Sequence, residues 1–455
     1  MSNRDSIFGT DGVRGKAGTG VLTSLESLRL GAALVECLGG TSGRIALARD
    51  TRESGDLLVS SVAAGIQGAG GTALNFGVLP TPGLALLVES LPECVAGVMV
   101  TASHNPWWDN GLKFFGGDGH KLSEQDQARL EDTYRVARDT DEVPGAGRAS
   151  GSLEDKSAWA EEAYVAALIG GARCRLDGRT IVVDHASGAA WNVLPRVLSE
   201  LGANVVGVAP DPDGRNINEG TGAVHPEEAA RKVVEVEAWA GVVVDGDGDR
   251  IYLVDEGGVI HDGDAIVGAL AGALSREQGL RGGAVIGTVT TGAGLEAFLA
   301  ARGIDLIRTA VGDRHVAMAM DENGCNLGGE SSGHVLTPDL CPSGDGSRVA
   351  IELLGRAIAS EASLSELLRA VPRFPVARRR VDAGLRPPLE GLSGLQDVLR
   401  EADEVLAAAD GRQLLRYSGT EPVLRVQVEG KDADLVEAWA DRIAAAANEA
   451  IIAVQ

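Results

Sequence analysis

The sequence repeats one local pattern three times: an apolar strand, a polar turn, an amphipathic helix, a glycine and a second apolar strand. In the first copy the helix places Leu58, Val62, Ile66 and Ala69 on one face. Helical spacing that alternates with short β-branched runs is typical of βαβ units, which form parallel sheets with right-handed crossovers. We therefore expect three related α/β domains. Their paired strands are residues 44–50 and 72–77, 180–184 and 204–208, and 284–287 and 304–309.

The pattern changes after residue 375. Strand and helix no longer alternate strictly there, so we expect a smaller α+β domain. Its predicted strands are residues 376–381, 414–417 and 424–429, and its predicted helices are residues 395–408 and 433–450.

The chain length and its breaks divide the protein further. At 455 residues the chain exceeds what one core organises, and a prior of about 150 residues per domain gives about three domains before the C-terminal change of pattern is considered. Polar or Gly/Pro-rich stretches near 140–151, 255–258 and 371–375 are the predicted boundaries. The fold class is therefore α/β: three related α/β domains with mixed or parallel sheets around a central cleft, plus a smaller C-terminal α+β domain. The predicted domains are residues 1–150, 151–255, 256–371 and 372–455.

The composition is acidic, with a formal net charge of −24 and a pI near 4.7. Because such a chain repels phosphate backbones and anionic headgroups at long range, nucleic acid and membrane surfaces are not expected as partners. An anionic small substrate would need a local cluster of Arg and Lys inside a cleft, and salt screening over about 8 Å allows such a local reversal of the field. Clustered cations are therefore informative.

The five cysteines are dispersed and show no C-x-x-C spacing, so neither a disulfide framework nor a zinc site is expected. The first 15 residues lack a basic segment followed by an apolar one, and no stretch reaches the roughly 18 apolar residues of a membrane span. We therefore expect reduced thiols and a cytoplasmic location.

A carboxylate cluster follows the predicted strand 241–244. Asp245, Asp247 and Asp249 alternate with glycines, so their side chains extend to one side of the loop. Carboxylates this close repel one another unless a cation compensates, and hard oxygen ligands favour Mg²⁺ or Ca²⁺. An EF-hand is excluded because Arg250 occupies its sixth position, where glycine is needed, and a strand follows. A solvated acidic turn is the structural alternative.

Ser103 lies in the loop Thr-Ala-Ser-His-Asn-Pro at residues 101–106, directly after the apolar run 95–100. A serine hydroxyl is a weak nucleophile, but once phosphorylated it is a compact phosphoryl store. The phosphoryl oxygens could complete the coordination of a cation held by the aspartates. The alternative is an ordinary turn with a capping hydroxyl. We expect an exposed hydroxyl that contributes little packing.

Two further groups suit phosphoryl chemistry. Lys113 lies on the predicted strand after the Ser103 loop, where it could assist proton transfer; an exposed strand lysine is the alternative. Near the C-terminus, Arg416, Ser418, Thr420 and Arg425 surround a glycine turn whose N–H groups could form an anion site. A purely structural turn is equally compatible with that composition.

The segment Gly-Glu-Ser-Ser-Gly at residues 329–333 matches the G-x-S-x-G pattern of serine hydrolases, with Ser331 as the nucleophile. A nucleophile elbow needs a strong strand before it, but residues 326–329 are poorly apolar. Glu330 and Ser332 are instead suited to bind sugar hydroxyls, and His334 lies close by as a phosphate or proton contact.

Taken together, these four loops closely resemble those of the α-D-phosphohexomutase superfamily, whose members carry a phosphoserine loop, a metal loop, a sugar loop and a phosphate loop in this order. Here the loops are residues 101–106, 245–250, 329–334 and 416–422. The segments FGTDGVRG at 8–15, DNGLKFF at 109–115 and RTAVGDR at 308–314 are similar to the bacterial phosphoglucosamine mutase branch.

The resemblance implies an intramolecular phosphotransferase that interconverts glucosamine 6-phosphate and glucosamine 1-phosphate. The reaction would pass through phosphoserine at Ser103 and a 1,6-bisphosphate, and it would feed UDP-N-acetylglucosamine and peptidoglycan synthesis. One Mg²⁺ per active site, a small phosphosugar substrate and a monomer or homodimer are implied.

The predicted site residues form four groups. The catalytic residues are Ser103, His104, Lys113, Arg250 and His334. The metal ligands are Ser103, Asp245, Asp247 and Asp249, and the sugar-binding residues are Glu330 and Ser332. The phosphate-binding residues are Arg14, Arg314, Arg416, Ser418, Gly419, Thr420 and Arg425, of which the first two are carried over from the resemblance.

Two positions depart from the branch pattern. Ser331 replaces the usual glutamine in the sugar loop, and His-Ala-Ser at 185–187 replaces Cys-Ala-Asn. Because the first departure touches substrate choice, phosphoglucomutase or phosphomannomutase activity is an alternative. A non-catalytic sugar-phosphate binding protein of the same fold is another.

Overall fold

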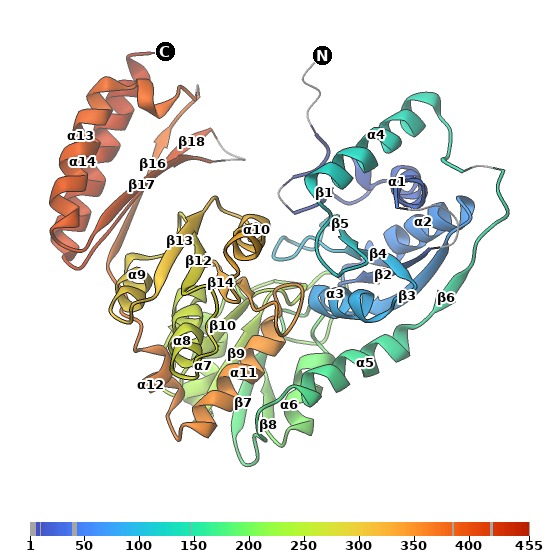
Figure 1. Ribbon diagram of the computed structural model, residues 1–455, viewed down its shortest axis with the longest axis horizontal. Coiled ribbons are helices and arrows are strands. Elements are labelled where there is room, and N and C mark those ends of the chain that lie inside the picture. The colour runs from blue at the N-terminus through green and yellow to red at the C-terminus, as the bar shows by residue number, and fades with distance from the viewer. Residues whose placement is uncertain are drawn as a thin grey trace.

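The computed structural model describes residues 6–9, 11–38, 43–145, 147–384, 386–418 and 422–454, and within them it contains four β-sheets covered by helices (Figure 1). The sheets follow one another along the chain. Gly419 and Thr420, two predicted phosphate-binding residues, lie outside the described residues.

The first sheet is mixed and has the order β1-β5-β4-β2-β3-β6. Strands β2, β3, β4 and β6 are parallel, and β1 and β5 run antiparallel to their neighbours. Helices α1, α2 and α4 cover one face, and α3 and α5 cover the other. The strands are β1 Val13–Lys16, β2 Arg44–Arg49, β3 Thr72–Val78, β4 Cys94–Val100, β5 Asp109–Gly116 and β6 Leu153–Asp155, and the helices are α1 Ser24–Cys37, α2 Gly55–Gly68, α3 Thr81–Ser90, α4 Glu124–Thr140 and α5 Ser157–Gly170.

The second and third sheets each contain one predicted parallel pair, β7 with β8 and β12 with β13. Their orders are β11-β10-β9-β7-β8 and β13-β12-β14-β15. The second sheet comprises β7 Thr180–Asp184, β8 Asn204–Gly207, β9 Ala240–Val244, β10 Ile251–Val254 and β11 Ile260–His261, with α6 Val193–Glu200 and α7 Glu227–Glu235. The third comprises β12 Ala284–Thr288, β13 Asp305–Thr309, β14 Gly328–Gly329 and β15 Val335–Leu336, with α8 Gly263–Arg276, α9 Ala293–Ala300, α10 Asp313–Asn323, α11 Gly346–Ala359 and α12 Leu364–Leu368.

The fourth sheet is antiparallel, in the order β16-β18-β17, and α13 and α14 pack on it. The predicted smaller C-terminal α+β domain is therefore confirmed, as are the three βαβ repeats. Its elements are β16 Val376–Asp382, α13 Ser393–Ala407, β17 Arg412–Tyr417, β18 Val423–Glu429 and α14 Ala433–Ile452.

The sheets do not follow the predicted domain limits strictly. Strand β6 pairs with β3 and carries the first sheet beyond residue 150, and β11 carries the second sheet beyond residue 255. Both strands are two or three residues long at a sheet edge, so they produce little periodicity in the sequence.

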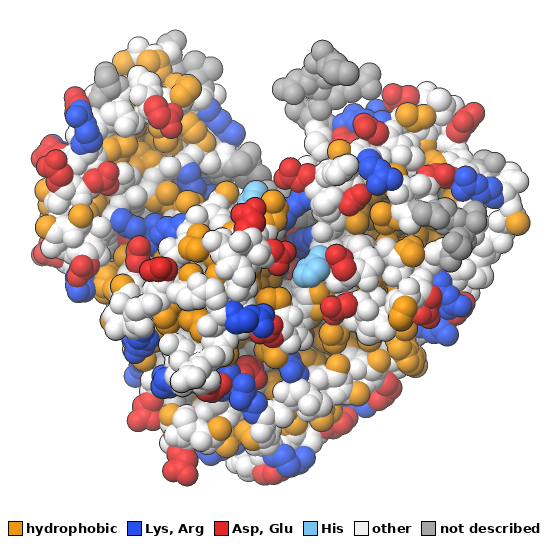
Figure 2. All heavy atoms as spheres, in the orientation of Figure 1, with side chains coloured by type: hydrophobic (Ala, Val, Ile, Leu, Met, Phe, Trp, Pro, Cys, Tyr) orange, Lys and Arg blue, Asp and Glu red, His pale blue; other side chains and the backbone are white. Residues whose placement is uncertain are grey.

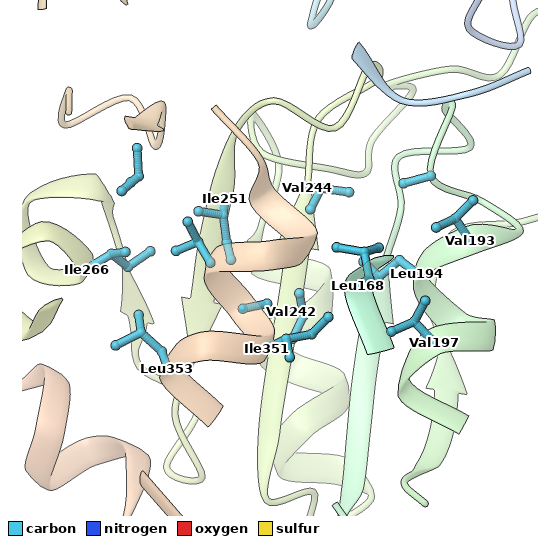
Figure 3. Packing of buried hydrophobic residues seen from close by; sticks show 14 of the residues in the cluster. Leu168, Val193, Leu194, Val197, Val242, Val244, Ile251, Ile266, Ile351 and Leu353 are labelled. Carbon is cyan, nitrogen blue, oxygen red and sulfur yellow. The ribbon is translucent and has the colours of Figure 1, made fainter. Parts of the chain in front are cut away.

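One hydrophobic core runs through the first three sheets. Helix α11 follows the third sheet in the chain, yet it packs against β9 and β10 of the second sheet, with Ile351 beside Val242 (Figure 3). The fourth sheet has a separate core, centred on Trp439, Ile443 and Leu424. Within the described part of the chain, no helix combines the length and the apolar character that a bilayer crossing requires.

Candidate active site

The Ser103 loop and the aspartate loop touch. Ser103 follows β4, Asp245 follows β9, and the Ser103 Oγ donates a hydrogen bond of 2.6 Å to the Asp245 Oδ2. The hydroxyl that we expected to be exposed is only 1% exposed, so that expectation was wrong. It is buried because Gly246 lets the two loops approach: a Cβ at Gly246 would lie 2.6 Å from the Ser103 carbonyl oxygen.

The three aspartates form a buried cluster. One oxygen from each of Asp245, Asp247 and Asp249 lies within 4.8 Å of the others. Burial, and then the charges of Asp249 and Asp247, raise the pKa of Asp245 well above its usual value. The Oδ1 atoms of Asp247 and Asp249 are buried and accept no hydrogen bond from described residues. Clustered hard oxygens with unused lone pairs fit a divalent cation such as Mg²⁺.

Lys113 supplies positive charge from β5. Its Nζ lies 2.7 Å from the Asp247 Oδ2, and 3.0 Å from both the Asp249 Oδ2 and the Asp11 Oδ2. Burial alone would lower the pKa of Lys113, but the three carboxylates outweigh burial and raise the pKa well above its usual value. The alternative of an exposed strand lysine is wrong, since this side chain is 1% exposed.

A second ion-pair network extends this cluster to the third sheet. The Lys121 Nζ lies 2.5 Å from the Asp11 Oδ1 and 2.6 Å from the Asp313 Oδ2. His334 lies between the networks, with its Nδ1 3.7 Å from Asp249 and its Nε2 3.4 Å from Asp313. Sequence reasoning missed Asp11, Lys121 and Asp313 as site residues, although Asp11 and Asp313 lie inside segments that carried the resemblance.

His104 and Arg250 flank the Ser103 hydroxyl and the aspartates. The His104 Nδ1 lies 3.3 Å from the Ser103 Oγ. Burial, and then the charges of Arg250 and Arg14, lower the pKa of His104 to about 4, so the ring is neutral at pH 7. The Arg250 N–H donates to the Asp245 Oδ1 at 3.2 Å.

The two arginines carried over from the resemblance lie in different places. Arg14, on β1, pairs with Asp11 and lies near the buried cluster. Arg314, in the first turn of α10, donates to the Leu122 carbonyl at 3.0 Å and to Gln127 at 3.3 Å. Arg314 therefore lies at the contact with the first domain, because α10 begins opposite the start of α4.

The sugar loop is the turn between β14 and β15. A β-bridge joins His334 to Arg250, so this turn lies against the aspartate loop. The Glu330 Oε1 accepts a hydrogen bond of 3.0 Å from the Gly312 N–H, and Ser332 is half-buried in the same turn.

Ser331 lies on the other side of this turn. Its hydroxyl approaches the Thr290 carbonyl at 3.5 Å and lines a cavity of about 340 Å³ between the third and fourth sheets. Strands β14 and β15 are antiparallel, and a nucleophile elbow requires a strand-to-helix turn. The serine hydrolase interpretation therefore has no structural support.

The phosphate loop belongs to the fourth sheet. Arg416 on β17 lies opposite Arg425 on β18, and the Arg425 Nη2 donates to the Ser418 Oγ at 3.2 Å. Burial and the charge of Arg425 lower the pKa of Arg416. Two guanidinium groups this close favour an anion between them. Figure 2 shows the surface hollowed between this C-terminal lobe and the N-terminal lobe.

A further group of polar residues supports the Ser103 and aspartate loops. The Thr81 hydroxyl donates to the Asp247 Oδ2 at 2.6 Å. Sequence reasoning also missed Asp50, Arg52, Thr101 and Asn218, which bind the Ser103 loop. The place of Asp50, Arg52 and Thr101 just after β2 and β4 was the one signal available, since ligands collect at the carboxyl ends of strands in α/β sheets.

Comparison with known proteins agrees with this geometry. Family models for phosphoglucomutase/phosphomannomutase match all four parts of the chain: alpha/beta/alpha domain I at residues 5–140, domain II at 162–258, domain III at 262–374 and the C-terminal domain at 376–446. The chain therefore belongs to the phosphoglucomutase/phosphomannomutase family.

Curated relatives cover nearly the whole chain. A phosphoglucosamine mutase of Novosphingobium aromaticivorans is 40% identical over 98% of this chain and 99% of its own length. One from Cereibacter sphaeroides is 41% identical over the same shares. Among solved structures, a phosphoglucomutase/phosphomannomutase family protein of Burkholderia thailandensis has a TM-score of 0.79 and 26% identity, covering 97% of both chains.

Proposed function

We propose that this chain interconverts glucosamine 6-phosphate and glucosamine 1-phosphate through phosphorylated Ser103 and a 1,6-bisphosphate. As a member of its family, the chain is a phosphohexomutase, an intramolecular phosphotransferase of the isomerase class. The observation that carries the proposal is the Ser103 hydroxyl, 2.6 Å from Asp245 within a buried aspartate trio. The choice of glucosamine rests on full-length relatives that bear the phosphoglucosamine mutase name.

In the transfer step, the bond between phosphorus and the Ser103 Oγ breaks and a bond from phosphorus to the free sugar hydroxyl forms. The hydroxyl proton passes to a neighbouring base, for which His104 is the candidate because its ring is neutral. The departing Ser103 oxygen regains a proton from a neighbouring acid, for which Lys113 is the candidate because its raised pKa keeps it protonated. Asp245, Asp247, Asp249 and the Ser103 oxygen would hold Mg²⁺, which neutralises charge as the P–O bond loosens. Arg250 adds a fixed positive charge beside this centre.

The intermediate must then be bound in two orientations. One anion site, built from Arg416, Ser418, Arg425 and the predicted Gly419 and Thr420, would accept a phosphate on either end of the sugar. Glu330 and Ser332 would bind ring hydroxyls in both orientations. The remaining proposed phosphate-binding residues are Arg14 and Arg314. The proposed role of His334 is to contact the phosphate or to transfer a proton.

Several broader statements belong to the same proposal. The substrate is a small phosphosugar, the product feeds UDP-N-acetylglucosamine and peptidoglycan synthesis, and the enzyme acts in the cytoplasm as a monomer or homodimer. The domain limits proposed are 1–150, 151–255, 256–371 and 372–455, except that the short edge strands β6 and β11 lie beyond the first two limits and complete the first and second sheets. Aspergillus fumigatus N-acetylphosphoglucosamine mutase, solved with GlcNAc-6P and magnesium, shares the fold at a TM-score of 0.65 and supports a phosphosugar and a divalent cation.

The decisive experiment combines mass and rate. After incubation with a hexose 1,6-bisphosphate, the intact protein should gain about 80 Da, the mass of one phosphoryl group, on Ser103, and Ser103→Ala should gain nothing. Turnover is then measured side by side on glucosamine, glucose, mannose and N-acetylglucosamine monophosphates. Preference for glucose or mannose would replace the glucosamine assignment. Full activity in Ser103→Ala would rule out a phosphoserine intermediate at this residue. Phosphosugar binding without turnover by the wild-type protein would indicate a non-catalytic binding protein.

A further inference from the structure

Arg52, in the loop between β2 and α2, donates most of its side-chain hydrogen bonds to main-chain oxygens in and just after the Ser103 loop. Its Nη2 donates to the carbonyl oxygens of Ser103 at 2.9 Å and Asn105 at 2.8 Å. Its Nη1 donates to the Asp109 carbonyl at 3.0 Å and also to the Pro106 carbonyl. The side chain is 1% exposed, among the largest that the protein buries.

The same group fixes the amide side of Ser103. The Arg52 Nε donates to the Asp50 Oδ2 at 2.8 Å, and the Thr101 hydroxyl donates to that oxygen at 2.6 Å. The Thr101 oxygen in turn accepts the Ser103 N–H at 2.9 Å. Both the N–H and the C=O of Ser103 are therefore hydrogen-bonded to one connected network, which consists of Arg52, Asp50 and Thr101. This matters because Ser103 has a φ of 53°, which a residue with a Cβ rarely adopts unless its surroundings hold it there.

Asn218, from the second domain, holds the same loop from the opposite side. Its Nδ2 donates to the Ser103 carbonyl at 2.9 Å and to the Asn105 carbonyl at 3.1 Å. The Ser103 carbonyl therefore receives a guanidinium from the first domain and an amide from the second. The Arg52 Nη1 and Nη2 and the Asn218 Nδ2 all donate to main-chain oxygens, which points to control of the loop's shape rather than to binding of a substrate.

We propose that Arg52 and Asn218 are positioning residues that orient the Ser103 Oγ toward Asp245 for phosphoryl transfer. This inference rests on the proposed function and deepens it. Neither residue touches the reacting atoms; each acts through the Ser103 backbone. Because a displacement of about 1 Å at a reacting group can cost about 100-fold in rate, loosening this loop should slow the chemistry more than it weakens substrate binding.

The test compares Arg52→Lys with Arg356→Lys. Arg356 is a matched control because it is 5% exposed and pairs with Glu352 and Glu277, away from the Ser103 loop. Lysine keeps the charge but lacks the planar fork that reaches several acceptors. We expect Arg52→Lys to lower kcat about 10- to 100-fold with KM changed less than about threefold, while Arg356→Lys keeps the wild-type kcat.

A second readout does not depend on turnover. Hydrogen exchange of peptides covering residues 101–111 should accelerate in Arg52→Lys and not in Arg356→Lys, while a merely structural role would accelerate exchange across the whole first domain. Asn218→Gly provides an independent variant, since glycine tolerates the φ of 59° at this position and removes both amide donors. It should slow phosphoenzyme formation about three- to tenfold, in keeping with the loss of hydrogen bonds of about 1 kcal/mol.

The outcomes separate this inference from the proposed function. If wild-type protein takes no phosphoryl group on Ser103, the proposed function fails whatever the exchange data show. If the wild type is phosphorylated and folded Arg52→Lys keeps its kcat and its 101–111 exchange, the positioning role is wrong. If Arg52→Lys does not fold, Asn218→Gly decides by the same criteria. Loss of folding in both variants would assign them a structural role and overturn the inference.

Discussion

The serine and metal half of the site differs from the phosphate half in how it is held. Ser103, Lys113 and the aspartates are buried at the meeting of two sheets that share one hydrophobic core. Arg416 and Arg425 lie on a fourth sheet with its own core. Arg416 is half-buried and Arg425 is exposed. The proposed phosphoryl-transfer centre is therefore part of a continuous protein interior, whereas the proposed anion site lies on a separate domain.

Contacts between the two halves are correspondingly polar. Arg412 of β17 pairs with Glu429 and donates to the Val289 carbonyl at 3.0 Å, across the boundary of the third and fourth sheets. Polar interfaces within a chain allow relative domain motion. The proposed mechanism requires the phosphoryl donor to stay fixed while the bisphosphate intermediate turns, and this division of the molecule suits both requirements. Figure 1 shows the fourth sheet standing apart from the first.

The largest effect should come from the buried half. Asp247→Asn removes one of the three clustered carboxylates. Mutating a residue that only hydrogen-bonds a metal ligand typically lowers metal affinity or activity roughly 10- to 100-fold, and removing a ligand itself should lower them more. We expect Mg²⁺ affinity, measured by calorimetry, and kcat both to fall by about 100-fold or more. Unchanged Mg²⁺ dependence would remove this loop from the metal assignment.

Arg416→Ala should produce the next largest effect, and of a different kind. The residue belongs to the proposed anion site, and a hydrogen bond to a charged group contributes about 1.5–3 kcal/mol. We expect KM for the phosphosugar to rise about 10- to 100-fold, while phosphorylation of Ser103 retains its stoichiometry. A loss of kcat with KM unchanged would show that the fourth sheet takes part in the chemistry, and the contrast between the halves would fail.

The boundary between the halves should respond to pH. Burial, and then the charges of Asp262 and Glu429, raise the pKa of Asp264 to about 7. The folded protein therefore holds the Asp264 proton more tightly than the unfolded chain does. The contribution of this carboxyl group to the free energy of unfolding is complete below about pH 4 and is lost as the pH rises toward 7.

Asp264→Asn removes this titration and keeps an acceptor for the Gly292 N–H. After allowance for solvent screening, the free energy of unfolding of the variant should exceed that of the wild type by on the order of 1 kcal/mol at pH 8, and the two should be equal at pH 4. Thermal unfolding across this range measures the difference, and exposed Asp434→Asn serves as the control. A difference that is constant with pH would contradict the assignment.

The smallest effect should come from Ser331→Gln. Its hydroxyl faces the Thr290 carbonyl in the cavity between the third and fourth sheets, and the lining of that cavity does not include the aspartate trio. We therefore expect the ratio of kcat/KM values for glucosamine and glucose phosphates to change less than about threefold, an effect below about 0.7 kcal/mol. A reversal of sugar preference would show that this turn presents residue 331 to the substrate.

Local pattern determined what could be predicted. The three βαβ repeats and the C-terminal elements are encoded in short-range periodicity, so the sequence sufficed for them. The edge strands β6 and β11 are too short to leave such a pattern, and the sheets run past the predicted limits there. The carboxylate cluster was predictable because its spacing is local, and one oxygen from each carboxylate does lie within 4.8 Å of the others.

Burial and backbone contacts could not be predicted in the same way. Ser103 is buried because Gly246, 143 positions along the chain, lets a loop from another sheet close on it, and no local pattern records that approach. Arg52 and Asn218 bind carbonyl oxygens, which every residue carries, so their partners leave no trace in side-chain type.

The position of α11 has a consequence for synthesis on the ribosome. The strands β9 and β10 are complete by residue 254, but the helix that covers their apolar face begins only at Gly346. A nascent or truncated chain that stops between these points leaves Val242 and Ile251 without that cover. We expect such chains to bind chaperones through this exposed apolar surface. Chaperone binding should end when the full-length chain is released and α11 covers the strands.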